Sequence, residues 1–385
     1  MAIQANGVKG LNMNQQNKKS NKTNWQLIFT MAGAMTATLI GSGFATGQEI
    51  MQYFVAHEWT GILGIIASFL AVGFSGASFF QAGFASKQNL DSPNDVFKVF
   101  AGDKIGSIYK YITLITLFLT YAVMVAGAGA TIEQQFGVPV YIGSAFMYVI
   151  SAITVMLSMQ KITNILGNIG PIIAIVAIIL GLASAFTNNA DLSQSATLVH
   201  EAVASGKIQA ASGNWLVSSL NYVGLIIILN AGFIAQVGVQ ANKLSETKLA
   251  ALFSSGIYAL GIFILYIAFM GAFSLVAGAQ VPTLSIANLL HPSLAYGFIV
   301  IILLAIYSTV VSMLWNVTTS VTTDGTTANK VAAALIGLVA TGIGLFLPFN
   351  QLVNIVYVIA GYFGIIFLFM MIWRQVTRLM TNNRG

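Results

Sequence analysis

The stretch Ile40-Gly41-Ser42-Gly43-Phe44-Ala45-Thr46-Gly47-Gln48-Glu49 decides how this chain folds. It lies inside the first long apolar segment, residues 24–56, in which Glu49 is the one charged residue. Glycine weakens a helix, because each one costs about 1 kcal/mol relative to alanine. Inside a membrane, an interrupted backbone is tolerated only where protein or a water-filled cavity supplies hydrogen-bond partners. The stretch therefore predicts a discontinuous membrane helix whose break forms a binding site.

The composition indicates an integral membrane protein. The 385 residues are 57% hydrophobic and only 7% charged, whereas a soluble domain carries about 25% charged residues. Cysteine is absent, which excludes disulfides and thiolate metal sites. The net charge of +6 raises the question of nucleic-acid binding, and the placement of the basic residues answers it below.

Apolar segments long enough to cross a bilayer, which takes roughly 20 residues, recur along the chain. Ten qualify: 24–56, 61–86, 107–132, 138–159, 162–187, 214–240, 247–279, 294–320, 328–347 and 350–376. The first would measure about 50 Å as one helix and must break or tilt within a core of about 30 Å. We expect residues 1–23 to be a disordered cytoplasmic tail and residues 24–380 to form one transmembrane domain.

The basic residues set the predicted orientation. With the amino terminus inside, 15 of the 16 lysines and arginines fall on the inner side, and only Lys207 falls outside. This predicts a multi-pass protein of the cell membrane with both termini cytoplasmic. Because the positive charge faces the inner leaflet, no nucleic-acid partner is expected. Residues 87–106 would form an inner loop with a short interfacial helix.

A weak internal repeat divides the chain into two halves. Short matches recur at an offset of 189 or 190: Asn24-Trp25 with Asn214-Trp215, Gly41-Ser42-Gly43-Phe44 with Asn230-Ala231-Gly232-Phe233, and Asn164-Ile165 with Asn354-Ile355. Five spans is an odd number, so the second half would cross the membrane in the opposite sense. The expected architecture is an all-α inverted repeat, 24–187 and 214–380, joined by an outer loop 188–213. Helices one and six would be discontinuous.

The stretch from Gly41 to Glu49 resembles the first-helix signature of the bacterial YkvI-type membrane proteins, a group within the amino acid–polyamine–organocation superfamily. Its core also resembles the Gly-Ser-Gly-Ile/Phe element with which amino-acid permeases of that superfamily bind substrate. The likeness in span number, order and loop pattern covers about residues 24–380. It implies a LeuT-like fold with substrate between broken helices one and six. It also implies that a cation site would lie between helices one and eight.

The break in helix one has the chemistry of a zwitterion site. Free amides on its outer half, from Gly43 to Thr46, suit a carboxylate, and free carbonyls on its inner half suit an ammonium or a metal cation. Glu49 can carry a proton, stay ionised beside a cation or hold a substrate amine. The alternative is that the glycines allow another helix to pack closely and that Glu49 caps the broken helix. The predicted substrate-binding residues of this stretch are Gly41, Ser42, Gly43, Phe44, Ala45, Thr46, Gln48 and Glu49.

Two further groups complete the predicted site. Asn230, opposite the first break in the repeat, can donate and accept hydrogen bonds, and Tyr222 precedes it as a gate or a packing aromatic. Span eight carries Ser308, Thr309 and Ser312, which with carbonyls of helix one could hold Na⁺. The alternative for these hydroxyls is a hydrogen bond back to their own helix. The predicted coupling residues are Glu49, Ser308, Thr309 and Ser312.

These features predict a secondary active transporter, not an enzyme, for an amino acid or similar small zwitterion. Na⁺ or H⁺ would drive alternating access, and no other cofactor is expected. Within transport, the alternatives are a nucleobase, a quaternary amine or another polar solute. A passive pore is the rival from another class, although it would need a polar stripe through several spans. An intramembrane enzyme would need a catalytic set, which one lone carboxylate does not supply.

Overall fold

The computed structural model describes residues 23–86, 93–156, 169–187, 191–323 and 325–382, and these residues form helices without a strand. The predicted tail lies outside the described residues except for Thr23, and so does Asn164 of the repeat. Seven of the described helices are long and apolar enough to cross a membrane, and Val140–Val155 and Ile175–Thr187 are shorter apolar helices. The all-helical, multi-pass class is confirmed. The count of ten spans and the inverted repeat stay predictions.

Helix one is broken where its glycines lie. It consists of α2 (Trp25–Leu39), α3 (Ser42–Thr46) and α4 (Gln48–Tyr53). Gly41 leaves the helical conformation with φ −91° and ψ −165°, which separates α2 from α3. Gly47 has φ 81°, a left-handed conformation that favours glycine, and it separates α3 from α4. The predicted discontinuity of the first helix is therefore confirmed.

The predicted break in helix six is wrong. This helix, α11 (Trp215–Gly238), runs without interruption through Asn230-Ala231-Gly232. The side-chain amide of Asn230 donates to Ile226 O of the same helix at 3.1 Å. Only one glycine stands in that triplet, and a single glycine costs about 1 kcal/mol, which packing on both sides of α11 can offset. Asn230 therefore does not mark an unwound segment.

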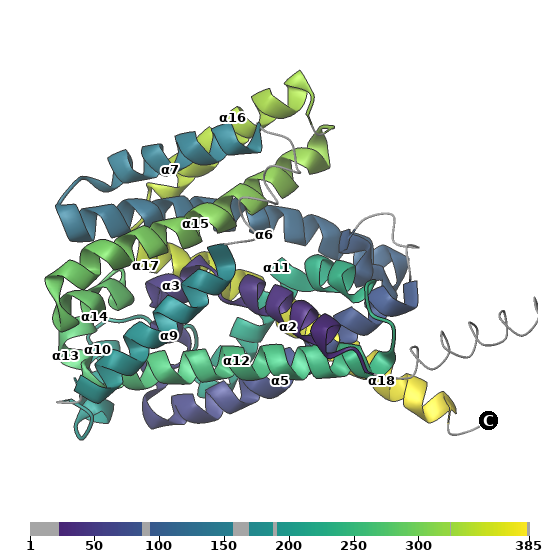
Figure 1. Cartoon of the computed structure of the whole chain (residues 1–385), viewed down its shortest axis with the longest axis horizontal. Helices are drawn as coiled ribbons and strands as arrows, with labels where there is room; N and C mark the ends of the chain where they lie inside the picture. Colours follow the sequence, from purple (N-terminus) through teal and green to yellow (C-terminus); the bar gives the residue numbers. More distant parts are fainter. Residues whose placement is uncertain (1–22, 87–92, 157–168, 188–190, 324, 383–385) are drawn as a thin grey trace, which may run out of the picture.

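Broken helix one lies between two groups of helices (Figure 1). Segments α2 and α3 have α5 (Gly61–Ser86) and α12 (Leu244–Gly271) on one side, with α6 (Val96–Phe136) and α15 (Pro292–Val321) on the other. Beyond α15 and α6 lie α7 (Val140–Val155) and α16 (Thr327–Gly344). Helix α9 (Ile169–Thr187) crosses near α3. This arrangement places the break well inside the molecule.

The two ends of the helix bundle differ (Figure 1). One end carries the short helices α10 (Ser195–Ala204), α13 (Phe273–Val276) and α14 (Pro282–Leu290), and the predicted outer loop 188–213 therefore contains a helix. The start of α2 and the end of α18 (Val358–Asn382) lie at the opposite end. The tenth segment begins as α17 (Phe349–Leu352) and a π-helical turn, η3 (Val353–Tyr357). Much of the predicted inner loop 87–106 is helical, since α6 starts at Val96 and kinks at Gly102.

Close packing of α11 against α18 explains Gly224. A Cβ at Gly224 would lie 2.1 Å from Gly361 O, and a Cβ at Gly364 would lie 2.0 Å from Gly224 O. The backbones of α11 and α18 are thus in direct contact. Small residues allow this approach between membrane helices, where dispersion contacts hold helices together. This contact holds α11 in place against α18.

Candidate functional site

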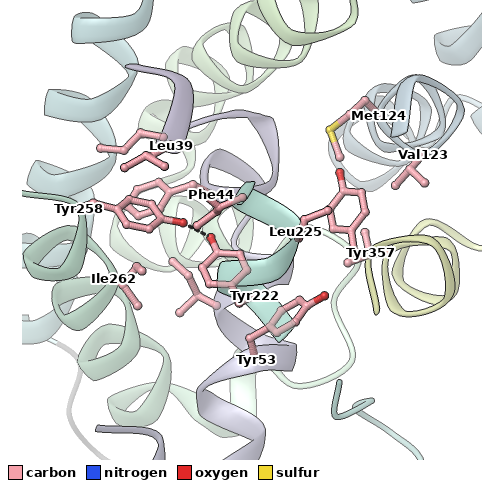
Figure 2. Packing of buried hydrophobic residues seen from close by; sticks show 14 of the residues in the cluster. Leu39, Phe44, Tyr53, Val123, Met124, Tyr222, Leu225, Tyr258, Ile262 and Tyr357 are labelled. Atoms are coloured by element: carbon pink, nitrogen blue, oxygen red, sulfur yellow. Dashed lines mark hydrogen bonds between the residues drawn. The ribbon is translucent and has the colours of Figure 1, made fainter. Parts of the chain in front are cut away.

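Glu49 lies at one end of a hydrogen-bonded chain that links three segments. Its Oε2 accepts a hydrogen bond of 2.7 Å from the hydroxyl of Tyr222 on α11. The hydroxyl of Tyr258 on α12 donates in turn to that of Tyr222 (Figure 2). The sequence predicted both Glu49 and Tyr222 as site residues, and the structure brings them into direct contact.

Gly43 makes room for this carboxylate. A Cβ at Gly43 would lie 1.7 Å from Glu49 Oε1 and 2.2 Å from its Cδ, so no other residue could occupy the position without moving Glu49. Glu49 is half-buried, whereas Gln48 and Ile50 on either side of it are buried. The glycine of the break and the acid that follows it form one unit.

Aromatic rings surround the carboxylate. Tyr222 packs against Tyr53 with ring centroids 4.9 Å apart and against Phe54 at 5.4 Å, while Tyr258 packs against Phe44 at 6.1 Å. Figure 2 shows Phe44 beside Tyr258, with Tyr53 below Tyr222. The hydroxyl of Tyr53 is buried and has no hydrogen-bond partner within the described structure. Aromatic faces and an unused hydroxyl beside a carboxylate can receive a cationic group.

No basic side chain neutralises Glu49 in the part of the chain that the structure describes. The ion pairs found there are Lys98–Asp95 and the pair between His200 and Glu58, neither of which includes Glu49. An unpaired carboxylate in a low-dielectric interior is costly. A proton, a metal cation or a substrate ammonium would remove that cost. The arrangement is suited to binding one positive charge.

The short helix α3 is held by contacts from two neighbouring helices. The hydroxyl of Thr283 on α14 donates to Ala45 O at 2.6 Å, and Ala45 packs against Ala305 of α15. Of the amides predicted to hold a carboxylate, that of Ala45 is already used by Gly41 O at 3.1 Å. Thr46 turns its hydroxyl to Gly43 O at 3.0 Å. This leaves the first-turn amides, up to Phe44, for a ligand.

Of the three hydroxyls predicted to hold Na⁺, one is shown close to helix one. Ser308 and Thr309 both donate to Ala305 O, and Ser312 donates to Thr309 O, so all three bond back to their own helix. Thr309 alone is shown close to helix one, since its Oγ1 lies 3.8 Å from where a Cβ of Gly41 would be. Ser312 is exposed. The structure thus brings helix eight to the break through Thr309.

Two other residues that were predicted to bind substrate make hydrogen bonds away from Glu49. Asn230 lies eight residues beyond Tyr222, about 12 Å along α11, and bonds within its own helix. Gln48 is buried and donates to Ala279 O at 2.7 Å. Sequence reasoning missed Tyr258 and Tyr53. A tyrosine hydroxyl in the middle of an apolar segment needs a partner, and that signal could have identified Tyr258.

Two proteins of Bacillus subtilis are similar in sequence to this chain. No protein-family model matches the chain. It is 23% identical over 355 residues to the uncharacterized membrane protein YkvI of Bacillus subtilis, spanning 92% of this chain and 96% of YkvI. It is also 25% identical over 226 residues to the uncharacterized protein YyaD of the same organism, which covers 57% of this chain and 60% of YyaD.

Solved transporters share the fold. MhsT, solved in complex with L-phenylalanine, matches with a TM-score of 0.52 at 16% identity, over 88% of this chain and 87% of MhsT. Mhp1, a nucleobase-cation-symport-1 family transporter, has a TM-score of 0.51 at 17% identity, covering 86% and 74%. A Na⁺-coupled sialic acid symporter has a TM-score of 0.51 at 14% identity, covering 85% and 72%. These three proteins are transporters, not enzymes. The chain is therefore a homologue of YkvI with a LeuT-like fold.

Proposed function

We propose that this chain is a secondary active transporter that carries an amino acid or similar small zwitterion across the cell membrane. The observation that carries the proposal is the unit of Gly43 and Glu49 at the break of helix one, with Tyr222 bonded to the carboxylate. A broken membrane helix needs partners for its free backbone groups, and a bound solute supplies them. The transporters of similar fold support the same conclusion at the level of the fold.

The substrate would bind through both of its charges. Its ammonium would approach Glu49 beside the packed rings of Tyr53 and Tyr222, and its carboxylate would approach the first-turn amides of α3. Glycine at position 41 leaves the backbone open to close approach, since the nearest side-chain atom there is Thr309 Oγ1 at 3.8 Å. A second candidate substrate is a quaternary or other organic amine, which the aromatic rings around Glu49 favour.

Coupling would use one of two cations. A proton would bind Glu49 itself, whereas Na⁺ would bind near Thr309, where α15 approaches Gly41. Uptake into proteoliposomes distinguishes them, because a sodium-coupled protein needs a Na⁺ gradient and a proton-coupled protein works in its absence with a pH gradient. A passive pore would show flux that rises in proportion to solute concentration without saturation.

A ligand screen is the first test of the proposal. Purified protein is heated with amino acids, amines and nucleobases, each with and without Na⁺, because a ligand that binds the folded state raises the apparent melting temperature. We expect an amino acid or a related amine to stabilise the protein. Stabilisation by nucleobases alone, or flux without saturation, would contradict the proposed substrate or the proposed class.

A further inference from the structure

A groove lies between the start of α6 and α18, and none of the residues that line it belongs to the candidate site. Phe100 and Gly102 line it from α6, and the stretch from Ile366 to Thr377 lines it from α18. Its volume is about 1040 Å³, which is at the upper end of the range of about 300–1,000 Å³ for small-molecule pockets. Many of its side chains on α18 are exposed, so the groove opens to the surroundings of the helix bundle.

A kink at Gly102 shapes one wall of the groove. Gly102 has φ 75° and ψ 172°, a positive φ that favours glycine, and it separates residues 96–101 from the rest of α6. A Cβ at Gly106 would lie 2.5 Å from Lys98 Cα. Residues eight positions apart would be about 12 Å apart in a straight helix. The chain therefore reverses at Gly102, and residues 96–101 fold back on α6.

Aromatic rings hold this reversed segment against α18. The ring centroid of Phe367, a buried residue of α18, lies 4.9 Å from that of Phe97 and 6.1 Å from that of Phe100. Both pairs are edge-to-face, which is an arrangement that aromatic rings prefer. The hydroxyl of Tyr109 on α6 also donates to Phe363 O at 2.9 Å. The wall of the groove is therefore part of the fold and is formed before any ligand binds.

The chemistry of the groove changes along α18. Ile366 and Thr377, its first and last lining residues on this helix, are about 16 Å apart. At the first end the lining side chains are apolar, and both Ile366 and Phe369 are exposed. The other end carries Trp373 and Arg374, and tryptophan is enriched where a membrane meets water. The groove therefore runs from the depth of lipid chains to the level of the headgroups.

Arg374 gives the groove a positive charge. It is the one charged side chain among the described residues that line the groove. Asp95, just before the reversed segment, pairs with Lys98 at 2.8 Å, which compensates its charge. Asp103 and Lys104, beyond the kink, are exposed and carry opposite charges. The guanidinium of arginine presents five donors in a planar fork that matches a phosphate group.

We propose that this groove binds an anionic phospholipid, with the phosphate at Arg374 and an acyl chain along Ile366 and Phe369. The predicted orientation places this end in the inner leaflet, and basic pockets between membrane helices on the cytoplasmic side bind anionic headgroups. A free phosphate would leave the apolar length of the groove uncovered. A zwitterionic lipid has the same phosphate but brings a positive ammonium group towards Arg374. Such a site requires that the chain spans a membrane, but not that it transports a solute.

Lipid binding to the purified full chain tests the site. The protein in detergent is titrated with dioleoyl phosphatidylglycerol, with dioleoyl phosphatidylcholine, which has the same acyl chains, and with inorganic phosphate. Bound lipid is counted by native mass spectrometry, and the apparent melting temperature is measured in parallel, because a ligand of the folded state raises it. Arg374→Gln is compared with Lys330→Gln. Lys330 is the matched control, an exposed basic residue of α16 outside the groove.

We expect the native chain to bind phosphatidylglycerol about fivefold more tightly than phosphatidylcholine, because one basic residue near an anionic headgroup is worth about 1 kcal/mol. Arg374→Gln should lose this preference, and Lys330→Gln should keep it. Inorganic phosphate alone should not raise the melting temperature. If Arg374→Gln does not elute as a folded protein, Phe369→Ser, at an exposed position, takes its place. It should weaken binding of both lipids, because the acyl chain loses a contact.

Three results would overturn the lipid site. The first is the native preference for phosphatidylglycerol in Arg374→Gln, or unchanged binding of both lipids in Phe369→Ser. The second is stabilisation by inorganic phosphate alone, which would leave the apolar part of the groove without a role. The third is a dimer of the lipid-free chain that dissociates in Phe369→Ser, which would assign the groove to a second copy of the chain. Since no flux is measured, each of these results is separate from a failure of the transport assay.

Discussion

Replacement of Gly43 by alanine separates the role of Glu49 from the stability of the fold. The added Cβ would lie 1.7 Å from Glu49 Oε1, while contacts under 3.0 Å do not persist, so the carboxylate must move by more than 1 Å. The clashing atoms belong to the end of a flexible side chain, not to the backbone. The protein should therefore fold while the hydrogen bond from Tyr222, 2.7 Å long in the native chain, is broken.

The expected loss of affinity is that of one hydrogen bond between the ligand's ammonium and the displaced carboxylate. A hydrogen bond to a charged group contributes about 1.5–3 kcal/mol, which corresponds to about 10- to 150-fold in affinity. The assay is the concentration of ligand needed for half of the thermal stabilisation, together with the KM of uptake into proteoliposomes. Both should rise by that factor in Gly43→Ala, while the melting temperature without ligand should fall only modestly, because the hydrogen bond from Tyr222 is lost but the backbone packing is kept.

Gly33→Ala is the control for this experiment. Gly33 lies in α2, and no atom is found within 4 Å of the position where its Cβ would stand. Alanine there should leave affinity unchanged and add up to about 1 kcal/mol of stability through helix propensity. Native affinity in Gly43→Ala would refute the placement of the substrate at Glu49.

Three further predictions concern the charge, the helix packing and the ion. Glu49→Gln keeps the shape of the side chain but removes its charge, so gradient-driven uptake should be abolished while size-exclusion profiles stay native. Gly224→Ala places a methyl group 2.1 Å from Gly361 O, a backbone atom that cannot turn aside, so the melting temperature should drop sharply or the protein should fail to fold, as measured by fluorescence-detected chromatography. Thr309→Val removes the hydroxyl nearest to Gly41 and should weaken stabilisation by Na⁺ at least tenfold in a sodium titration, whereas Ser312→Ala, at an exposed position, should change it less.

The break in helix one could be predicted because its cause is local. Gly41 and Gly47 adopt conformations that interrupt the helix, and the cost of glycine is a property of the residue itself. The contact of Tyr222 with Glu49 depends on which faces of two helices meet, and the sequence indicated the residues but not the bond between them.

The error at Asn230 has a physical reason. The repeat alignment assigned it the role of the first break, but one glycine in Asn230-Ala231-Gly232 does not interrupt a helix that is packed against α5 and α18. Tyr258 was missed because its hydrogen bond is made with Tyr222, 36 residues away on another helix. Polar groups within apolar segments identify candidates, but only the fold decides which of them meet.

Uptake by reconstituted protein, compared between the native chain and Glu49→Gln, tests the central claim most directly. With the amino acid or amine that gives the largest thermal stabilisation, the native chain should show saturable uptake that requires a Na⁺ or H⁺ gradient, and Glu49→Gln should show none. Uptake that rises linearly with concentration and is equal in both proteins would contradict a transport site at the break of helix one.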